Sequence, residues 1–229
     1  MPKKLSGTLV VLDVETTGSG EDSRVTEMAF VALNLTRWRQ LMKLQPVEPL
    51  SELALPVQVS QLSFLVNPGQ SPSARAVRLN GITNAMLAGE DGFSRSSVQR
   101  IVNFLKRRSK PIFLIAHNGN VCDFPALAKE IKALSPPLWA LKAQSLTTWK
   151  KEMRKVFVLD SLQCLRQIEK DWLKTTPKLS EELFGDAGQA HRALPDAVRL
   201  FSVCLAYGAD FLDQLKPLGE PFADYLSSA

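Results

Sequence analysis

The sequence is poor in the residues on which disulfide-stapled, zinc-binding and membrane-spanning proteins depend. Its 229 residues include only three cysteines and two histidines, and the cysteines stand far apart, at positions 122, 164 and 204. This spacing argues against a disulfide framework or a structural zinc site and favours a reducing compartment. No apolar run approaches the roughly 20 residues that span a bilayer, and residues 1–7 contain no apolar signal core. We therefore expect an intracellular protein, cytoplasmic or nuclear, with no membrane partner.

The charge balance is mildly basic. Lysine and arginine number 28 against 23 aspartates and glutamates, which gives a net charge of +5 and a pI near 9.2. Such an excess favours a polyanionic partner without identifying one. The length suits one large domain, so we predict a single domain over residues 1–229. A stretch with three prolines, at about residues 44–56, is expected to form an irregular insertion because proline interrupts ladder bonding.

Apolar patterning predicts three strands first, and then strands that alternate with helices. The expected strands cover residues 9–12, 25–33, 57–66, 111–116 and 156–159, and the expected helices cover residues 73–79, 94–108, 123–134, 161–172 and 195–207. This order is typical of an α/β protein with a mixed five-stranded sheet and helices on both of its faces.

Two acids follow the first apolar run. Asp13 and Glu15 stand two residues apart at the end of the expected strand, so their side chains point to the same side of it. Two neighbouring carboxylates repel each other and raise each other's pKa, and a divalent cation removes that conflict. Taken alone, the pair is equally consistent with a strand end that runs into solvent.

Three later residues complete a candidate set at element boundaries. Asp123 follows the fourth expected strand, His191 lies in a loop, and Asp196 stands in the first turn of a helix opened by Pro195. Four carboxylates without a Cys/His cluster suit Mg²⁺ or Mn²⁺. Two such ions activate water and stabilise the leaving oxygen in phosphodiester cleavage, and a histidine beside them suits a general base.

These residues lie in segments that resemble a known family. DVETTG (13–18), HNGNVCDFP (117–125) and HRALPD (191–196) resemble the three exonuclease motifs of the DEDDh branch of ribonuclease-H-like 3′–5′ exonucleases. The segments Asn67-Pro68 and Asn80-Gly81-Ile82-Thr83 resemble the region before the second motif. RVTEMAFVAL (24–33) and the proline-bearing insertion resemble the three-prime repair exonuclease group most closely.

The resemblance implies a ribonuclease-H-like fold and an enzyme that removes nucleotides from DNA 3′ ends, with single-stranded or frayed ends preferred. It implies two Mg²⁺ ions, for which Mn²⁺ substitutes. It assigns metal binding to Asp13, Glu15, Asp123 and Asp196, and the general base to His191. It assigns substrate binding to Glu15, Thr16, Thr17, Gly18, Ile82 and Cys122.

Two positions depart from the family pattern. Ser19 stands where relatives often have a leucine that wedges against the terminal base, and Cys122 stands where many have a tyrosine. Substrate grip is therefore expected to differ from that of relatives. Beyond these assignments, we expect His117 to fix a turn and Asp160 to cap the helix that follows it.

Other functions stay open on the sequence. An RNA-trimming or proofreading exonuclease of the same branch would carry the same acids. A relative that only binds nucleic acid would have a broken carboxylate set, whereas this set is complete.

The third expected strand has the features of an exposed sheet edge that pairs with another copy. No charged side chain occurs between residues 53 and 74, whereas edges are usually protected by charge, proline or a bulge. The three-prime repair group forms dimers by joining such edges, so the resemblance implies a homodimer through residues 57–66. The alternative is that the proline-bearing insertion folds back over this edge.

Overall fold

The computed structural model describes residues 5–43, 59–134, 153–168, 191–215 and 219–223. The predicted insertion at residues 44–56 lies outside these ranges, as do the first two residues of the predicted strand 57–66 and the last four of the predicted helix 161–172.

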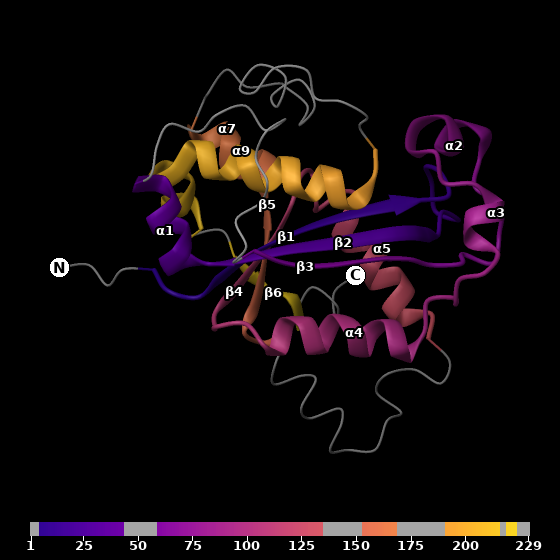
Figure 1. Ribbon diagram of the computed structural model, residues 1–229, viewed down its shortest axis with the longest axis horizontal. Helices are drawn as coiled ribbons and strands as arrows, with labels where there is room; N and C mark the ends of the chain where they lie inside the picture. Colours follow the sequence, from indigo (N-terminus) through magenta and orange to yellow (C-terminus); the bar gives the residue numbers. More distant parts are fainter. Residues whose placement is uncertain (1–4, 44–58, 135–152, 169–190, 216–218, 224–229) are drawn as a thin grey trace.

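The described residues form a mixed sheet with the strand order β3-β2-β1-β4-β5-β6 (Figure 1). Its strands are β1 (Thr8–Thr16), β2 (Val25–Asn34), β3 (Ser60–Leu65), β4 (Ile112–Ala116), β5 (Val156–Asp160) and β6 (Glu220–Pro221). β1, β2 and β3 pair antiparallel, β4 and β5 continue the sheet parallel to β1, and β6 pairs antiparallel with β5. The predicted α/β architecture is confirmed. The predicted count of five strands is corrected to six, because two-residue β6 is too short to leave an alternating pattern.

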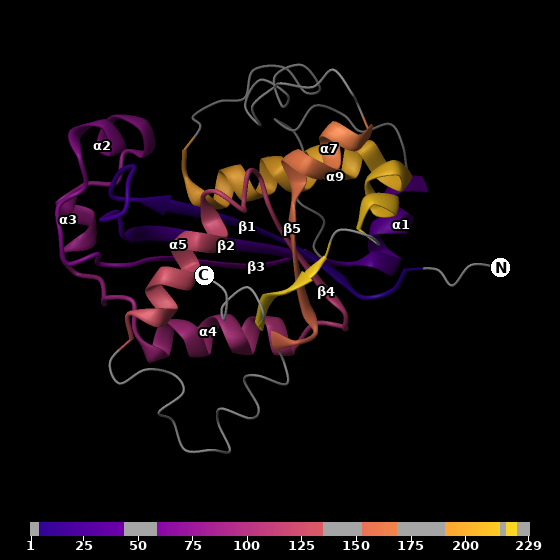
Figure 2. The ribbon, with the colours of Figure 1, turned by 180° about the vertical axis from the view of Figure 1, so that it is seen from behind.

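Helices cover both faces of the sheet. They are α1 (Leu35–Lys43), α2 (Ala74–Asn80), α3 (Asn84–Leu87), α4 (Arg95–Lys106), α5 (Asp123–Lys132), α7 (Ser161–Ile168) and α9 (Ala193–Gln214). Figures 1 and 2 show α1, α7 and α9 on one side of the sheet, α4 and α5 on the other, and α2 and α3 beyond one end of it. No helix in the described ranges has the length and apolar character needed to cross a membrane.

Two helices differ from the sequence-based expectation. α1 was not predicted, although Leu35, Trp38, Leu41 and Met42 recur at helical spacing. Leu35 and Trp38 are buried, and the other two pack against the same core. α9 runs beyond the predicted end at residue 207 and is bent at Gly208, whose backbone has φ 53° and ψ −114°. Glycine adopts this left-handed region without the steric cost that other residues meet.

β1 is buried on both faces, as its apolar run predicts. Leu9 and Val11 contribute to the core beneath α9, whereas Val10 and Leu12 contribute to the core beneath α4 and α5. All four side chains are fully buried. If this strand slipped by one residue, each of these side chains would move from its own core to the opposite one. Its acidic end is therefore held in a defined place.

Candidate active site

Three acids from two elements meet at the end of β1. Asp13 and Glu15 come from the strand, and Asp196 comes from the first turn of α9, which packs across β1 and β2. Each offers a carboxylate oxygen, and these oxygens all lie within 4.8 Å of one another. The register shifts between Glu15 and Thr16, and such bulges turn a strand away from its partner beside many active sites.

Asp123 approaches the same strand from the opposite layer. It is the first residue of α5, it is buried, and its Oδ1 accepts a hydrogen bond from the backbone N–H of Val14 at 2.9 Å. Val14 lies between Asp13 and Glu15 in β1, so this bond docks the third predicted motif acid against the strand that carries the first two. The Asp123 carboxylate also raises the pKa of Asp13, which reflects their proximity.

His191 lies two residues before the first residue of α9 and is exposed. Its backbone φ is 71°, an uncommon value for a residue with a side chain. Its backbone N–H donates to Oδ2 of Asp196 at 2.6 Å. The geometry thus ties the predicted general base to a predicted metal ligand through the backbone and leaves the imidazole available.

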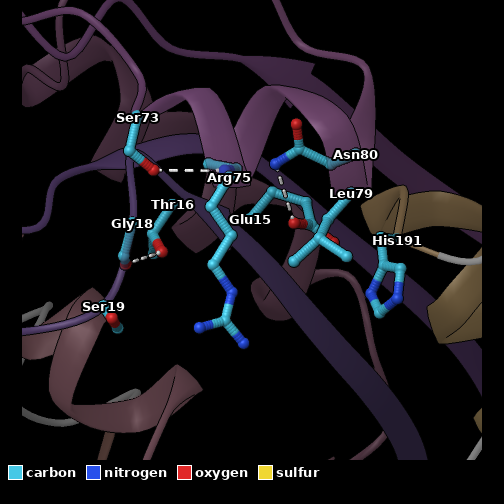
Figure 3. Close-up of a pocket in the computed structure, with 10 residues that line it drawn as sticks. Glu15, Thr16, Gly18, Ser19, Ser73, Arg75, Leu79, Asn80 and His191 are labelled. Atoms are coloured by element: carbon cyan, nitrogen blue, oxygen red, sulfur yellow. Dashed lines mark hydrogen bonds between the residues drawn. The ribbon is translucent and has the colours of Figure 1, made fainter.

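A pocket of about 380 Å³ opens beside these residues (Figure 3). Its lining comes from the end of β1, the loop after β1, α2 with its N-cap residue Ser73, and His191. The lining residues are Glu15, Thr16, Gly18, Ser19, Ser73, Arg75, Ala76, Leu79, Asn80 and His191. The pocket therefore has carboxylate and imidazole groups beside a wall with both a cationic and an apolar side chain.

Sequence reasoning missed the side chains that α2 contributes. Asn80 donates from Nδ2 to Oε2 of Glu15 at 3.1 Å, which orients that carboxylate. Arg75 and Leu79 also line the pocket, and Leu79 is 49% exposed. The usable signal was the i, i+4 spacing of Arg75 and Leu79 in a short predicted helix, which places them on one face.

The predicted substrate residues divide into two groups. Glu15, Thr16 and Gly18 line the pocket, whereas Thr17, Ile82 and Cys122 are absent from the lining that the described residues form. The Thr17 hydroxyl accepts hydrogen bonds from Arg24 N and Gln70 Nε2, at 3.1 and 2.9 Å, within the loop.

The other two residues of the second group lie in different surroundings. Ile82 is fully buried, and its backbone N–H is bound by the side chain of Asn80. Cys122 is exposed and precedes α5. Leu79, three residues before Ile82 in the chain, lines the pocket.

Two neighbouring polar residues have structural contacts. Asp160 accepts through Oδ1 from the backbone N–H of Leu162 at 2.9 Å, so the predicted cap of α7 is confirmed. His117 Nδ1 lies 3.1 Å from Ser161 Oγ, and burial lowers the pKa of His117 to about 4. His117 is therefore neutral near pH 7.

Burial makes the acidic cluster unstable as a set of free carboxylates. Desolvation, followed by the charges of Asp123, Asp196 and Glu15, raises the pKa of Asp13 well above its usual range. Burial likewise raises the pKa of Glu15 to about 7 and that of Asp123 to about 8, and it raises the pKa of Asp196. Carboxylate oxygens at close range, without thiolate or imidazole ligands among them, fit a hard divalent cation.

Comparison with known proteins agrees with this chemistry. The Exonuclease family model matches residues 10–203. Three-prime repair exonuclease 1 of Bos taurus is 30% identical over 210 residues, which cover 86% of this chain and 62% of the relative. Three prime repair exonuclease 2 of Mus musculus is 31% identical over 134 residues, which cover 57% of this chain and 55% of the relative. The chain thus spans about three fifths or less of the length of these relatives.

Solved structures share the fold at low sequence identity. The nuclease domain of 3′hExo, a DEDDh family member bound to rAMP, superposes with a TM-score of 0.61 and 13% identity, covering 89% of this chain and 92% of that one. The E. coli ExoI–ssDNA complex superposes with a TM-score of 0.59 and 15% identity, covering 87% of this chain and 40% of that one. The predicted ribonuclease-H-like fold and the predicted DEDDh resemblance are confirmed.

The raised carboxylate pKa values predict an unusual pH dependence of stability. An acid with a raised folded-state pKa binds more protons in the folded than in the unfolded state, so the free energy of unfolding falls as pH rises toward that pKa. For Glu15 and Asp123 this loss continues up to about pH 7 and 8, respectively. His117 has the opposite effect, but its gain is complete by its unfolded-state pKa of 6.5. The Tm of the metal-free protein should therefore fall between about pH 6.5 and 8.5.

Thermal unfolding with chelator, and then with Mg²⁺, tests this expectation. Mg²⁺ should raise the Tm more at the alkaline end, where the acids are ionised and bind the ion without losing protons. Asp13→Asn serves as the control, because removing one charge should weaken the pH dependence. A metal-free Tm that rises across this window would contradict the assigned electrostatics.

Proposed function

The chain belongs to the exonuclease family, and we propose that it is a metal-dependent 3′–5′ exodeoxyribonuclease that removes nucleotides from DNA 3′ ends. The observation that carries the proposal is the convergence of Asp13, Glu15 and Asp196 within 4.8 Å, beside a pocket that His191 also lines. The similarity to three-prime repair exonucleases supports DNA ends as the substrate.

The four motif acids are proposed to hold two Mg²⁺ ions, with Mn²⁺ able to replace them. When bound, such ions lower the pKa of an attacking water and neutralise charge on the leaving oxygen. The chain's own groups orient the acids for this role. Asn80 binds Glu15, Val14 N–H binds Asp123, and Arg199 Nη1 donates to Asp196 Oδ1 at 2.7 Å.

His191 is proposed to take the proton from the attacking water. The residue is exposed at the pocket and its backbone is tied to Asp196, so the imidazole stands next to the acids without occupying their oxygens. A histidine held in this position can act as the general base.

The pocket is proposed to hold the terminal nucleotide. Thr16 and Gly18 border it from the loop after β1, and Gly18 lies close to α2, because a Cβ there would meet Ser73 Oγ at 3.2 Å. Leu79 offers an apolar surface for a base, and Arg75 offers a cation for a phosphate. Cys122 lies outside this wall, so any contact it makes would be with a more distant part of the substrate.

The sheet edge supports the proposal of a homodimer. β3 ends the strand order and pairs only with β2 among the described strands, so its outer N–H and C=O groups can pair with a second copy. An antiparallel contact about a two-fold axis would close such an assembly.

The three free cysteines support the proposal of a reducing compartment, either cytoplasmic or nuclear.

The roles of His191 and Asp13 predict different defects. His191→Ala should lower turnover by about 10²–10⁴-fold, the usual contribution of a general base, while Mn²⁺ binding survives. Asp13→Asn should lose both turnover and metal affinity, because it removes a ligand charge but little volume. Digestion of 5′-labelled single-stranded DNA with Mg²⁺, with and without chelator, measures activity and polarity together.

Calorimetric titration with Mn²⁺ separates the two roles. Loss of metal binding in His191→Ala would make His191 a ligand and overturn the general-base assignment. Wild-type turnover in Asp13→Asn at saturating Mg²⁺ would overturn the metal site. Binding of DNA by the wild-type protein without any cleavage would favour the non-catalytic alternative.

Substrate preference should follow the cost of unpairing. Single-stranded or frayed DNA should be degraded faster than blunt duplex, because terminal nucleotides enter the pocket unpaired. Ser19→Leu should raise the rate on blunt duplex by supplying the wedge that Ser19 lacks. Initial rates on matched DNA substrates test both statements, and equal wild-type rates on the two ends would contradict them. An RNA strand of the same sequence, if degraded faster, would favour the RNA-trimming alternative.

The dimer proposal predicts sensitivity to charge on β3. Gln61→Lys with Ser63→Lys should give a monomer, because like charges would face each other across the two-fold axis. Light scattering after size-exclusion chromatography measures the mass. Gln99→Lys with Asn103→Lys adds the same charge to the exposed face of α4 and should leave the dimer intact. A wild-type monomer at micromolar concentration would refute the proposal.

A further inference from the structure

A buried glutamate near the beginning of β2 uses both of its oxygens to hold the start of α9. Glu27 lies on β2 and is only 4% exposed. Its Oε1 accepts from Arg192 Nη2 at 2.7 Å, and its Oε2 accepts from Arg192 Nε at 2.9 Å and from the backbone N–H of Ala193 at 2.9 Å. The two arginine bonds form a bidentate pair, which fixes orientation as well as distance.

This contact replaces an ordinary helix cap. Arg192 is the N-cap residue of α9 and provides no side-chain cap bond, although the first N–H groups of a helix have no partner within it. Glu27 supplies that partner from a neighbouring strand, and its negative charge suits the positive end of the helix. The place where α9 begins is therefore set by β2.

The residues on either side of the contact that Glu27 makes with Arg192 and Ala193 are the ones proposed to do chemistry. His191 precedes Arg192, and its φ of 71° is a strained value that persists only where the surroundings enforce it. The His191 N–H is bound to Asp196, so the loop is held from one side by Asp196 and from the other by Glu27. Glu27 also stands opposite Glu15 in the β1–β2 register.

We propose that Glu27 and Arg192 are positioning residues that align His191 and Asp196 with the two acids of β1. This inference rests on the proposed exonuclease function. The two residues touch no reacting atom in this role; they act by setting where α9 begins and how the His191 backbone turns.

A second pair offers a matched control. Glu130 on α5 accepts from Arg24 Nε and Nη2, both at 2.8 Å, and from the backbone N–H of Val25 at 3.1 Å. This pair has the same bidentate geometry and the same additional backbone bond. It joins α5 to the start of β2 and makes none of its three bonds to residues 191–196.

The experiment compares steady-state kinetics of Glu27→Gln, Arg192→Lys, their double variant and Glu130→Gln. The first two should lower kcat by about 10–100-fold, as loss of a partner that orients a metal-site residue does, with KM unchanged. Arg192→Lys keeps the positive charge but loses the planar fork, so an effect shared with Glu27→Gln reports geometry rather than charge. The double variant should be no worse than the poorer single variant, because both remove one contact.

Glu130→Gln should lower the Tm comparably and keep wild-type kcat, which separates positioning from general stability. The Arg192 side chain is 37% exposed, so Arg192→Lys provides a readout if Glu27→Gln fails to fold. Wild-type kcat in Arg192→Lys, or an equal loss of kcat in Glu130→Gln, would overturn the proposal.

A measurement without substrate separates this inference from the proposed function. The chain has two histidines, His117 and His191, so two sets of imidazole signals are expected in NMR spectra. Glu27→Gln and Arg192→Lys should shift the His191 signals and leave those of His117 in place, whereas Glu130→Gln should move neither. Unshifted His191 signals in both variants would overturn the positioning role of Glu27 and Arg192. A wild-type protein that cleaves no DNA would overturn the proposed function, while shifted His191 signals would still support the positioning role.

Discussion

The burial of several carboxylates close to one another is the constraint on which the rest of this structure depends. Asp13 lies within the electrostatic reach of Asp123, Asp196, Glu15 and Glu27, and burial removes the water that would screen them. Charges of one sign in such surroundings raise one another's pKa and oppose folding. Each acid other than Asp13 is therefore held by its own hydrogen-bond donor. The donors are Asn80 for Glu15, Val14 N–H for Asp123, Arg199 and His191 N–H for Asp196, and Arg192 and Ala193 N–H for Glu27.

These donors come from separate layers of the fold, and their hydrogen bonds hold the acids in place despite the repulsion between them. The donor to Glu15 lies on α2, Asp123 reaches β1 from α5, and Asp196 reaches it from α9. Because β1 is buried on both faces, the helices of both layers pack against the same rigid strand. Sites built on rigid elements keep their groups in place better than sites built on loops. Packing between these layers thus gathers the acids at one end of β1.

The pocket wall combines groups from the strand that carries two of the acids with groups from a separate helix. Glu15 and His191 line the pocket, and α2 contributes Arg75 and Leu79. Ser19 borders the same space with a small hydroxyl in place of a bulky apolar group. The large apolar side chain among the lining residues is Leu79. Because α2 carries none of the clustered acids, its pocket-lining side chains can be changed while the carboxylates stay unchanged.

Local pattern, together with the resemblance to known motifs, predicted most strands, most helices and the candidate acids of the site. Apolar runs and helical spacing depend on neighbours within a few residues, so β1, β4, β5, α4 and α5 could be predicted from the printed sequence. The motif residues Asp13, Glu15, Asp123, His191 and Asp196 were found in the same way, from their places at element boundaries and their resemblance to known motifs. The exceptions were the two-residue β6 and the bend at Gly208, which have little local signal, and α1, whose helical spacing is present in the sequence but was not used.

Only the tertiary structure decided which side chains surround those acids. Glu27 and Arg192 are 165 positions apart in the chain, and Asn80 and Glu15 are 65 apart, so no short-range pattern connects either pair. Whether Ile82 or Leu79 faces the pocket depends on how α2 docks against the end of β1, and Thr17 is turned inward by its bonds to Arg24 and Gln70. The sequence specifies which residues can do the chemistry because strand and helix periodicity is local. Their alignment is decided by packing between layers, which brings together residues that the chain keeps far apart.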